Sequence, residues 1–84
     1  MAARSTYRIS DPASLGTALA DLRAELGWTQ AELAEWSGLN RTYLSGLEND
    51  EPTIALRRLM AAISTLGYEI TLTPKPTADE EQDW

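Results

Sequence analysis

Four leucines recur along residues 12–26 at spacings of four, three and four, which is the spacing of one face of an α-helix. Asp11 is a good N-cap immediately before this segment, and Pro12 suits the first helical position. Gly27 provides a stop signal at the other end. The pattern predicts an amphipathic first helix over about 12–26.

Two short helices are predicted directly after the first. Thr29 and Glu32 have the spacing of a capping box, and Gly38 ends the helix that they start. Asn40 is a good N-cap for a third helix, from about Arg41 to residue 48. The pattern therefore predicts two short helices on either side of a turn at Gly38.

A fourth helix is predicted over about 54–66, where apolar residues repeat at helical spacing until Gly67. The inward faces of the four helices supply the expected core. Its members are Leu15, Leu19, Leu22, Leu33, Leu44, Leu47, Leu56, Leu59 and Ile63.

Between residues 68 and 73 the period changes to two, with Tyr68, Ile70 and Leu72 on one face of a short strand. A lone strand leaves backbone donors and acceptors unpaired, so it must find a partner. Residues 6–9 of the same chain are one candidate, and the same strand of a second subunit is the other. We favour the second subunit, which makes Tyr68, Ile70 and Leu72 a dimer interface.

The predicted fold is all-α, with four helices and one short C-terminal strand that pairs across a dimer. Residues 1–10 form an N-terminal arm, 11–67 the helical domain, 68–73 the dimerisation strand and 74–84 an acidic disordered tail. The second and third helices have helix-turn-helix geometry, in which the second helix of the pair enters the DNA major groove. Arg41, Thr42 and Ser45 then occupy the outer face of that helix, where side chains reach base edges.

The motifs of the helix pair resemble those of Cro and lambda-repressor type helix-turn-helix domains over about residues 13–67. They are T-Q-A-E-L-A at 29–34, the Gly38–Leu39 turn and L-x-x-L-E-N at 44–49. The chain is more similar still to HipB-like antitoxins. That likeness extends through G-W-T-Q at 27–30, the strand at 68–73 and an acidic tail that ends in Trp84.

The resemblance implies a four-helix lambda-repressor-like homodimer that binds a palindromic operator and holds a HipA-like serine/threonine kinase toxin inactive. Such a protein is the antitoxin of a type II toxin-antitoxin system and represses its own operon. In this sequence Thr29 and Gln30 would contact phosphate, and Arg41, Thr42 and Ser45 would read bases. The full expected DNA-binding set is Thr29, Gln30, Asn40, Arg41, Thr42, Tyr43 and Ser45, and Trp84 and Trp36 are the expected partner contacts.

The sequence departs from the family pattern at three positions. Trp36 stands where a polar residue is usual, so an indole is expected on the surface of the second helix. Gly46 lies inside the recognition helix at a cost of ~1 kcal/mol relative to Ala. Tyr43 brings bulk near the DNA-facing side. These departures bear on the operator sequence rather than on DNA binding itself.

Composition narrows the functional classes. The chain has no Cys and no His, which removes disulfides, thiolate and imidazole catalysis and the commonest zinc ligands. We therefore expect no enzyme activity, no metal and no cofactor. No apolar run is long enough for a membrane span and no signal peptide is seen, so the expected location is the cytoplasm, at the nucleoid.

The net charge of −6 argues against nucleic acid at first sight, but four carboxylates lie in the last six residues. Without them seven basic residues face nine acidic ones, a balance of −2. Glu48, Asp50 and Glu51 are interpreted as solvated charges. Arg57 and Arg58 either meet phosphate or face solvent.

Two other functions stay open. One is a stand-alone or phage-type repressor without a toxin. The other is a protein-interaction module that has lost DNA binding, which the net negative charge and an exposed Trp36 would favour.

Overall fold

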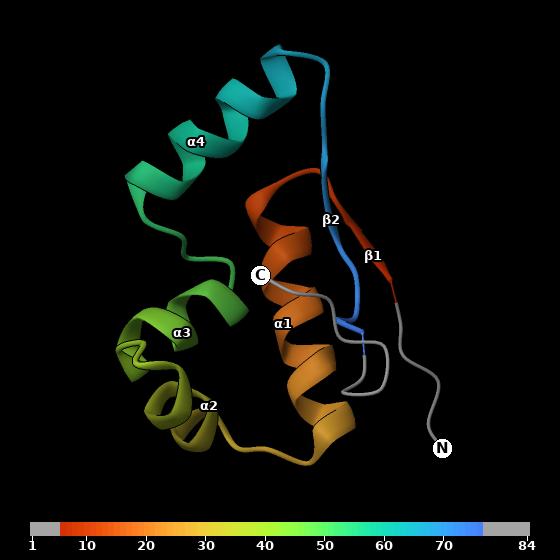
Figure 1. Ribbon diagram of the computed structural model, residues 1–84. Helices are drawn as coiled ribbons and strands as arrows, with labels where there is room; N and C mark the ends of the chain where they lie inside the picture. The colour runs from red at the N-terminus through yellow and green to blue at the C-terminus, as the bar shows by residue number, and fades with distance from the viewer. Residues whose placement is uncertain (1–5, 77–84) are drawn as a thin grey trace.

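A computed structural model describes residues 6–76 of the chain. The order of elements is β1 (Tyr7–Ile9), α1 (Pro12–Leu26), α2 (Gln30–Ser37), α3 (Arg41–Glu48), α4 (Ile54–Thr65) and β2 (Ile70–Leu72). Figure 1 shows α1 in the middle, α2 near its C-terminal end, α3 beside its middle and α4 crossing above its N-terminal end. The four predicted helices are confirmed, and β1 is an additional element.

The helices begin where the sequence predicted because a side chain caps each one. The N-caps Asp11, Thr29, Asn40 and Thr53 each accept a hydrogen bond from the backbone N–H three residues later. These bonds satisfy donors that the first turn of a helix leaves free. At the ends of α1 and α2, Gly27 and Gly38 adopt left-handed conformations with φ of 75° and 83°.

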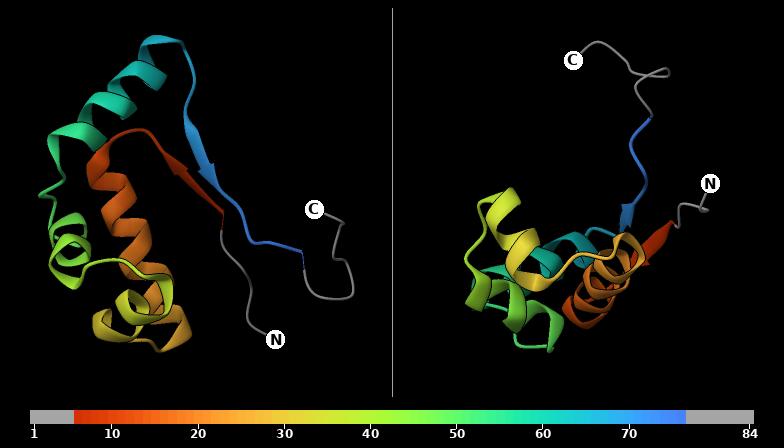
Figure 2. Two further views of the ribbon diagram at one scale, coloured as in Figure 1. Left: turned by 60° about the vertical axis from the view of Figure 1, so that its left-hand side comes forward. Right: turned by 90° about the horizontal axis from the view of Figure 1, so that it is seen from below.

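The strand at the C-terminal end finds its partner within the chain. β2 pairs antiparallel with β1, and the register places Tyr7 opposite Leu72 and Ile9 opposite Ile70. Figure 2 shows the two strands side by side along one flank of α1. The segment 6–9, which we ranked second as a partner, therefore supplies the pairing edge. Strand pairing with a second subunit stays a prediction.

The sheet helps to close the core instead of only presenting an interface. Ile9 is 1% exposed and clusters with Ala18 of α1 and Met60 of α4. Ile70 and Leu72 are half-buried and pack against the same cluster. Residues 7–9 are thus part of the folded domain, because β1 carries one of the most deeply buried side chains described in the chain.

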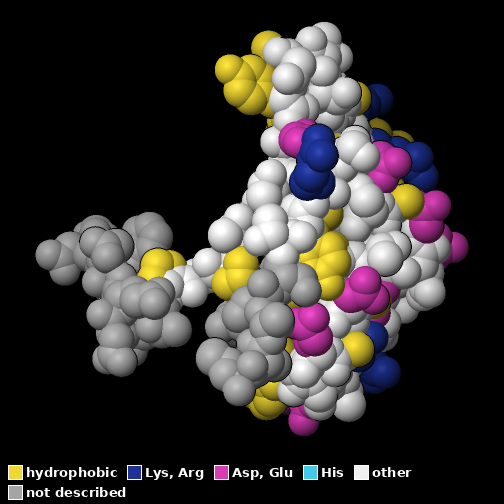
Figure 3. Space-filling model, turned by 90° about the vertical axis from the view of Figure 1, so that its right-hand side faces the viewer, with side chains coloured by type: hydrophobic (Ala, Val, Ile, Leu, Met, Phe, Trp, Pro, Cys, Tyr) yellow, Lys and Arg dark blue, Asp and Glu magenta, His cyan; other side chains and the backbone are white. Residues whose placement is uncertain are grey.

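The inward face of α4 differs from our prediction at Leu59. Met60 is buried, but Leu59, which we placed in the core, is 57% exposed, so that prediction is wrong. A stripe of exposed apolar residues results, which we call the α4 stripe. It consists of Ala55, Leu59, Ala62 and Leu66. In Figure 3, hydrophobic side chains also gather over the turn between α4 and β2.

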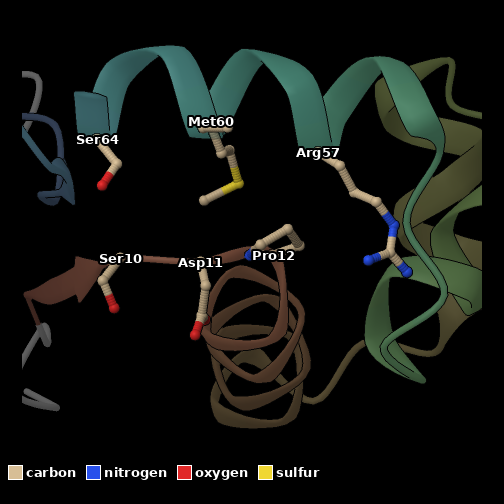
Figure 4. A pocket seen from close by; sticks show the side chains of 7 residues that line it. Ser10, Asp11, Pro12, Arg57, Met60 and Ser64 are labelled. Atoms are coloured by element: carbon tan, nitrogen blue, oxygen red, sulfur yellow. The ribbon is translucent and has the colours of Figure 1, made fainter. Parts of the chain in front are cut away.

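The buried side of α4 faces the start of α1. Figure 4 shows Met60 reaching toward Pro12 across a cleft of about 280 Å³. Arg57 lines this cleft too, from the first turns of α4.

None of the four helices described within residues 6–76 has the length and apolar character of a membrane span.

Candidate nucleic-acid interface

The pair α2–α3 is held by the buried side of α3. Leu44 is fully buried and Leu47 is 5% exposed, and Ala34 of α2 is buried as well. The backbone of α3 also lies close to α1, because a Cβ atom at Gly16 would lie 1.8 Å from the Leu47 carbonyl oxygen. This close contact leaves the opposite side of α3 facing outward.

The outward side of α3 is polar and accessible. Arg41 and Thr42 are exposed, and Ser45 is half-buried one turn further on. Together with Gln30 of α2 they line a surface hollow of about 440 Å³. The structure therefore brings together four of the seven residues that we expected to contact DNA.

The other three predicted DNA contacts flank this hollow or start its helices. Thr29 caps α2 in a reciprocal capping box with Glu32. The Asn40 Oδ1 atom accepts the Tyr43 N–H at 3.1 Å, so Asn40 fixes the first turn of α3. Tyr43 itself is half-buried. All three lie at or next to the N-terminal ends of α2 and α3.

A hydrogen-bonded network beneath the hollow ties the three helices together. Arg23 of α1 donates two bonds to the Glu48 carboxylate, at 3.0 and 2.8 Å, and a third to the Trp28 carbonyl. The Gln30 Nε2 atom donates to the same carboxylate at 2.9 Å. A primary amide has two N–H donors, so this bond orients Gln30 and keeps its second donor for another partner.

Glu48 is not the solvated charge that we expected. Its side chain is 5% exposed, and the Arg23 guanidinium beside it lowers the pKa of the Glu48 carboxyl below its ordinary value of 4.5. The same pair raises the pKa of Arg23. A buried carboxylate needs such partners, and they account for the position of Glu48 at the end of α3. The sequence around Glu48 gives no signal of this burial, because its partners lie on α1 and α2.

The turn after α3 explains the glycine inside the recognition helix. Asp50 has a left-handed φ of 61°, and the chain then folds back so that the Glu51 N–H bonds to the Gly46 carbonyl at 2.6 Å. A Cβ atom at Gly46 would lie 3.0 Å from the Glu51 carbonyl oxygen. Gly46 therefore permits a close approach of this turn, which offsets its low helix propensity.

The outer face of α2 has a different character. Trp36 is 59% exposed and makes an edge-to-face contact with Trp28, with ring centroids 5.0 Å apart. The sequence from residue 24 to residue 40 has three Glu and no Lys or Arg. The expected exposed indole is confirmed, and it lies on a helix that carries no basic side chain. Trp84 lies outside the described residues.

Comparison with known proteins agrees with this geometry. The helix-turn-helix family model HTH_3 matches residues 19–72, which include both α2 and α3. The chain belongs to this helix-turn-helix family. With the exposed polar face of α3, the membership makes it a DNA-binding transcription regulator.

Curated relatives refine the likeness. The chain is 31% identical to "Antitoxin HipB" of Escherichia coli O6:H1, over 94% of this chain and 88% of that protein. It is 28% identical to "Antitoxin HipB" of Escherichia coli K12, over 95% of this chain and 98% of that one. A "Neisseria hypothetical transcription factor" of Neisseria meningitidis is 39% identical, over 63% of this chain and 53% of its own length. No solved structure matches.

Proposed function

We propose that the chain is a sequence-specific repressor that acts as the antitoxin of a HipA-like serine/threonine kinase and represses its own operon. The accessible polar face of α3 carries the DNA-binding part of this proposal. Similarity to two proteins named "Antitoxin HipB", over more than nine-tenths of the chain, supports the antitoxin part. Such a protein would work in the cytoplasm, at the nucleoid.

In the proposed complex, α3 lies in the major groove. Arg41 pairs with a guanine through its two-pronged guanidinium, and Thr42 and Ser45 contact neighbouring base edges. Thr29 and Gln30 meet a phosphate at the N-terminal end of α2, where free backbone N–H groups favour an anion. Asn40 and Tyr43 contact the duplex beside them.

The proposed regulator is a homodimer on a palindromic operator, with its two α3 helices ~34 Å apart. The α4 stripe supports a second copy as the partner. Leu59 is 57% exposed and Leu66 74%, and the sequence from 59 to 67 contains no charged residue. Two copies of an uncharged face can meet across a twofold axis without like-charge repulsion.

The strand β2 adjoins this face, so the expected dimer contacts at Tyr68, Ile70 and Leu72 stay part of the proposal. Tyr68 is 74% exposed and is free to contact a second copy. Ile70 and Leu72 are half-buried against the chain's own core, so they would contribute only their remaining surface.

The toxin would be held by two aromatic residues. Trp36 offers an exposed indole on α2, and Trp84 ends an acidic segment whose charges suit a basic partner surface. The test begins with the genome: a kinase-like reading frame should lie beside this one. Deletion of residues 77–84 should weaken capture of that kinase in a pull-down and leave DNA binding intact, and unchanged capture would remove the tail from the proposal.

DNA binding is tested by Arg41→Ala on a fragment of the protein's own promoter. The variant should lose about tenfold in affinity per half-site, because one bidentate base contact contributes ~1 to 3 kcal/mol. Arg8→Ala is the matched control, since Arg8 is an exposed arginine paired with Glu69, and its strand β1 lies on the other side of α1 from α3 (Figure 1). Equal losses in the two variants would refute base reading by Arg41. Failure of the wild-type protein to bind any duplex would favour a protein-interaction module.

A further inference from the structure

Glu51 lies in an unexpected place for a carboxylate. It lines the hollow on the DNA-facing side of α3 together with Gln30, Arg41, Thr42, Ser45 and Gly46. It is the one acidic residue among those that line this hollow. An acid among proposed phosphate and base contacts requires a physical explanation, because DNA repels it.

The backbone of Glu51 is fixed against the recognition helix. The left-handed turn at Asp50 and the 2.6 Å hydrogen bond from the Glu51 N–H to the Gly46 carbonyl hold it there. The missing side chain at Gly46 allows the approach. Glu51 is therefore attached to α3 and would approach a duplex with it.

Glu51 is in neither of the two salt bridges that residues 6–76 form. Among residues 6–76, the cations that form salt bridges are Arg8 and Arg23, and their partners are Glu69 and Glu48. Glu51 is exposed, in contrast to Glu48, whose charge Arg23 compensates beneath the same surface. Of the two carboxylates near this hollow, Glu51 is the one whose charge a bound duplex would meet.

We propose that Glu51 is a specificity-determining residue of the DNA-facing surface. Its carboxylate repels the phosphates of any duplex, and the cost is offset only where a base amino group, cytosine N4 or adenine N6, donates a hydrogen bond to it. Glu51 thus weakens binding to random DNA more than binding to the operator, which is selection against the wrong partner. The proposal rests on the proposed function, since it needs α3 to meet DNA.

The test compares Glu51→Gln with Glu35→Gln on two labelled duplexes, the protein's own promoter fragment and a random sequence of equal length. Glu35 is exposed on α2 and is not among the residues that line the hollow, so its variant changes the net charge equally. In fluorescence anisotropy, Glu51→Gln should bind the random duplex at least about threefold more tightly than Glu35→Gln does. The ratio of promoter to random affinity should fall.

A second variant keeps the Glu51 charge and moves its backbone. Gly46→Ala places a methyl group against the Glu51 carbonyl, so it should also lower the promoter-to-random ratio while circular dichroism stays helical. Equal effects of Glu51→Gln and Glu35→Gln, or equal strengthening on both duplexes, would overturn the role of Glu51. A wild-type protein that binds neither duplex would instead overturn the proposed function, and this role with it.

Discussion

Two helices of this small domain each expose a face, and the faces have opposite chemistry. The outer side of α3 carries Arg41, Thr42 and Ser45 around a hollow. The α4 stripe carries only aliphatic side chains, including Leu59 and Leu66. Both helices start at a similar cap, so the difference lies in which residues follow the cap. The first face suits a duplex and the second suits another apolar surface.

The two faces also differ in what supports them. α3 rests against α1 through the close contact at Gly16, and the network around Glu48 fixes it from below. α4 is anchored mainly by Met60 and half-buried neighbours such as Leu56, with a cleft left beside them. A rigid α3 keeps base contacts in register. The more lightly held α4 would gain stability from a second copy.

The largest expected effect is on the support of α3. Gly16→Ala would put a methyl group 1.8 Å from a backbone oxygen of α3, so the helices must separate. We expect a loss of about 3 kcal/mol or more in the free energy of unfolding, at the upper end of overpacking effects. Urea denaturation measures this loss, and Thr17→Ala on the exposed neighbouring position is the control. Similar stability of the two variants would contradict the tight α1–α3 contact.

The next effect concerns the α4 face. Leu59→Glu should weaken self-association about 100-fold, because a twofold axis would bring two new carboxylates together. The variant should keep its helical circular dichroism, since Leu59 is 57% exposed in the single chain. Sedimentation equilibrium measures the dissociation constant, with Thr17→Glu on α1 as a charge-matched control. A dimer that tolerates Leu59→Glu would place the interface elsewhere.

Much of this fold was predictable because local signals decide it. Each helix starts at a residue whose side chain caps it. Gly27 and Gly38 end helices at positions where the backbone is left-handed, a conformation that glycine adopts without strain. The bounds of α1, α2 and α3 agree with the prediction for this reason. The sequence signal for β1 was weaker, since its three residues are a strand only because they pair with β2.

The errors come from contacts between distant segments. Helical periodicity allows either Leu59 or Met60 to face inward, and packing against Ile9 and Ala18 selects Met60. Glu48 was expected in solvent because its partners Arg23 and Gln30 lie in other helices. Four of the residues that line the α3 hollow were predicted from the motif, namely Gln30, Arg41, Thr42 and Ser45. Glu51 was not, because the turn at Asp50 carries it there.

A smaller effect is expected from the network under α3. Glu48→Gln removes the charge that accepts from Arg23, and we expect about 2 kcal/mol of lost stability at neutral pH, as for a hydrogen bond to a charged group. The folded-state pKa of Glu48 is lowered, so its contribution is present above the ordinary value of 4.5 and is lost as pH falls through the lowered value. The gap between wild type and variant in urea denaturation should therefore narrow on acidification. A gap that is constant from neutral pH to pH ~2 would contradict the ionic role.

The smallest expected change in stability comes from removing helix caps, and it compares the DNA-facing side of α3 directly with the α4 stripe. Asn40→Ala removes the cap of α3 and Thr53→Ala removes the cap of α4, and each should cost about 1 kcal/mol in thermal or urea unfolding. Their effects on DNA should differ, because Asn40 orients the first turn, which carries Arg41, whereas Thr53 orients the helix with the apolar stripe. Anisotropy titration of the promoter fragment, at a protein concentration that keeps the self-association state constant, should show a loss for Asn40→Ala alone. If the two variants bind equally, the start of α3 has no special place in DNA recognition and the contrast between the two helices fails.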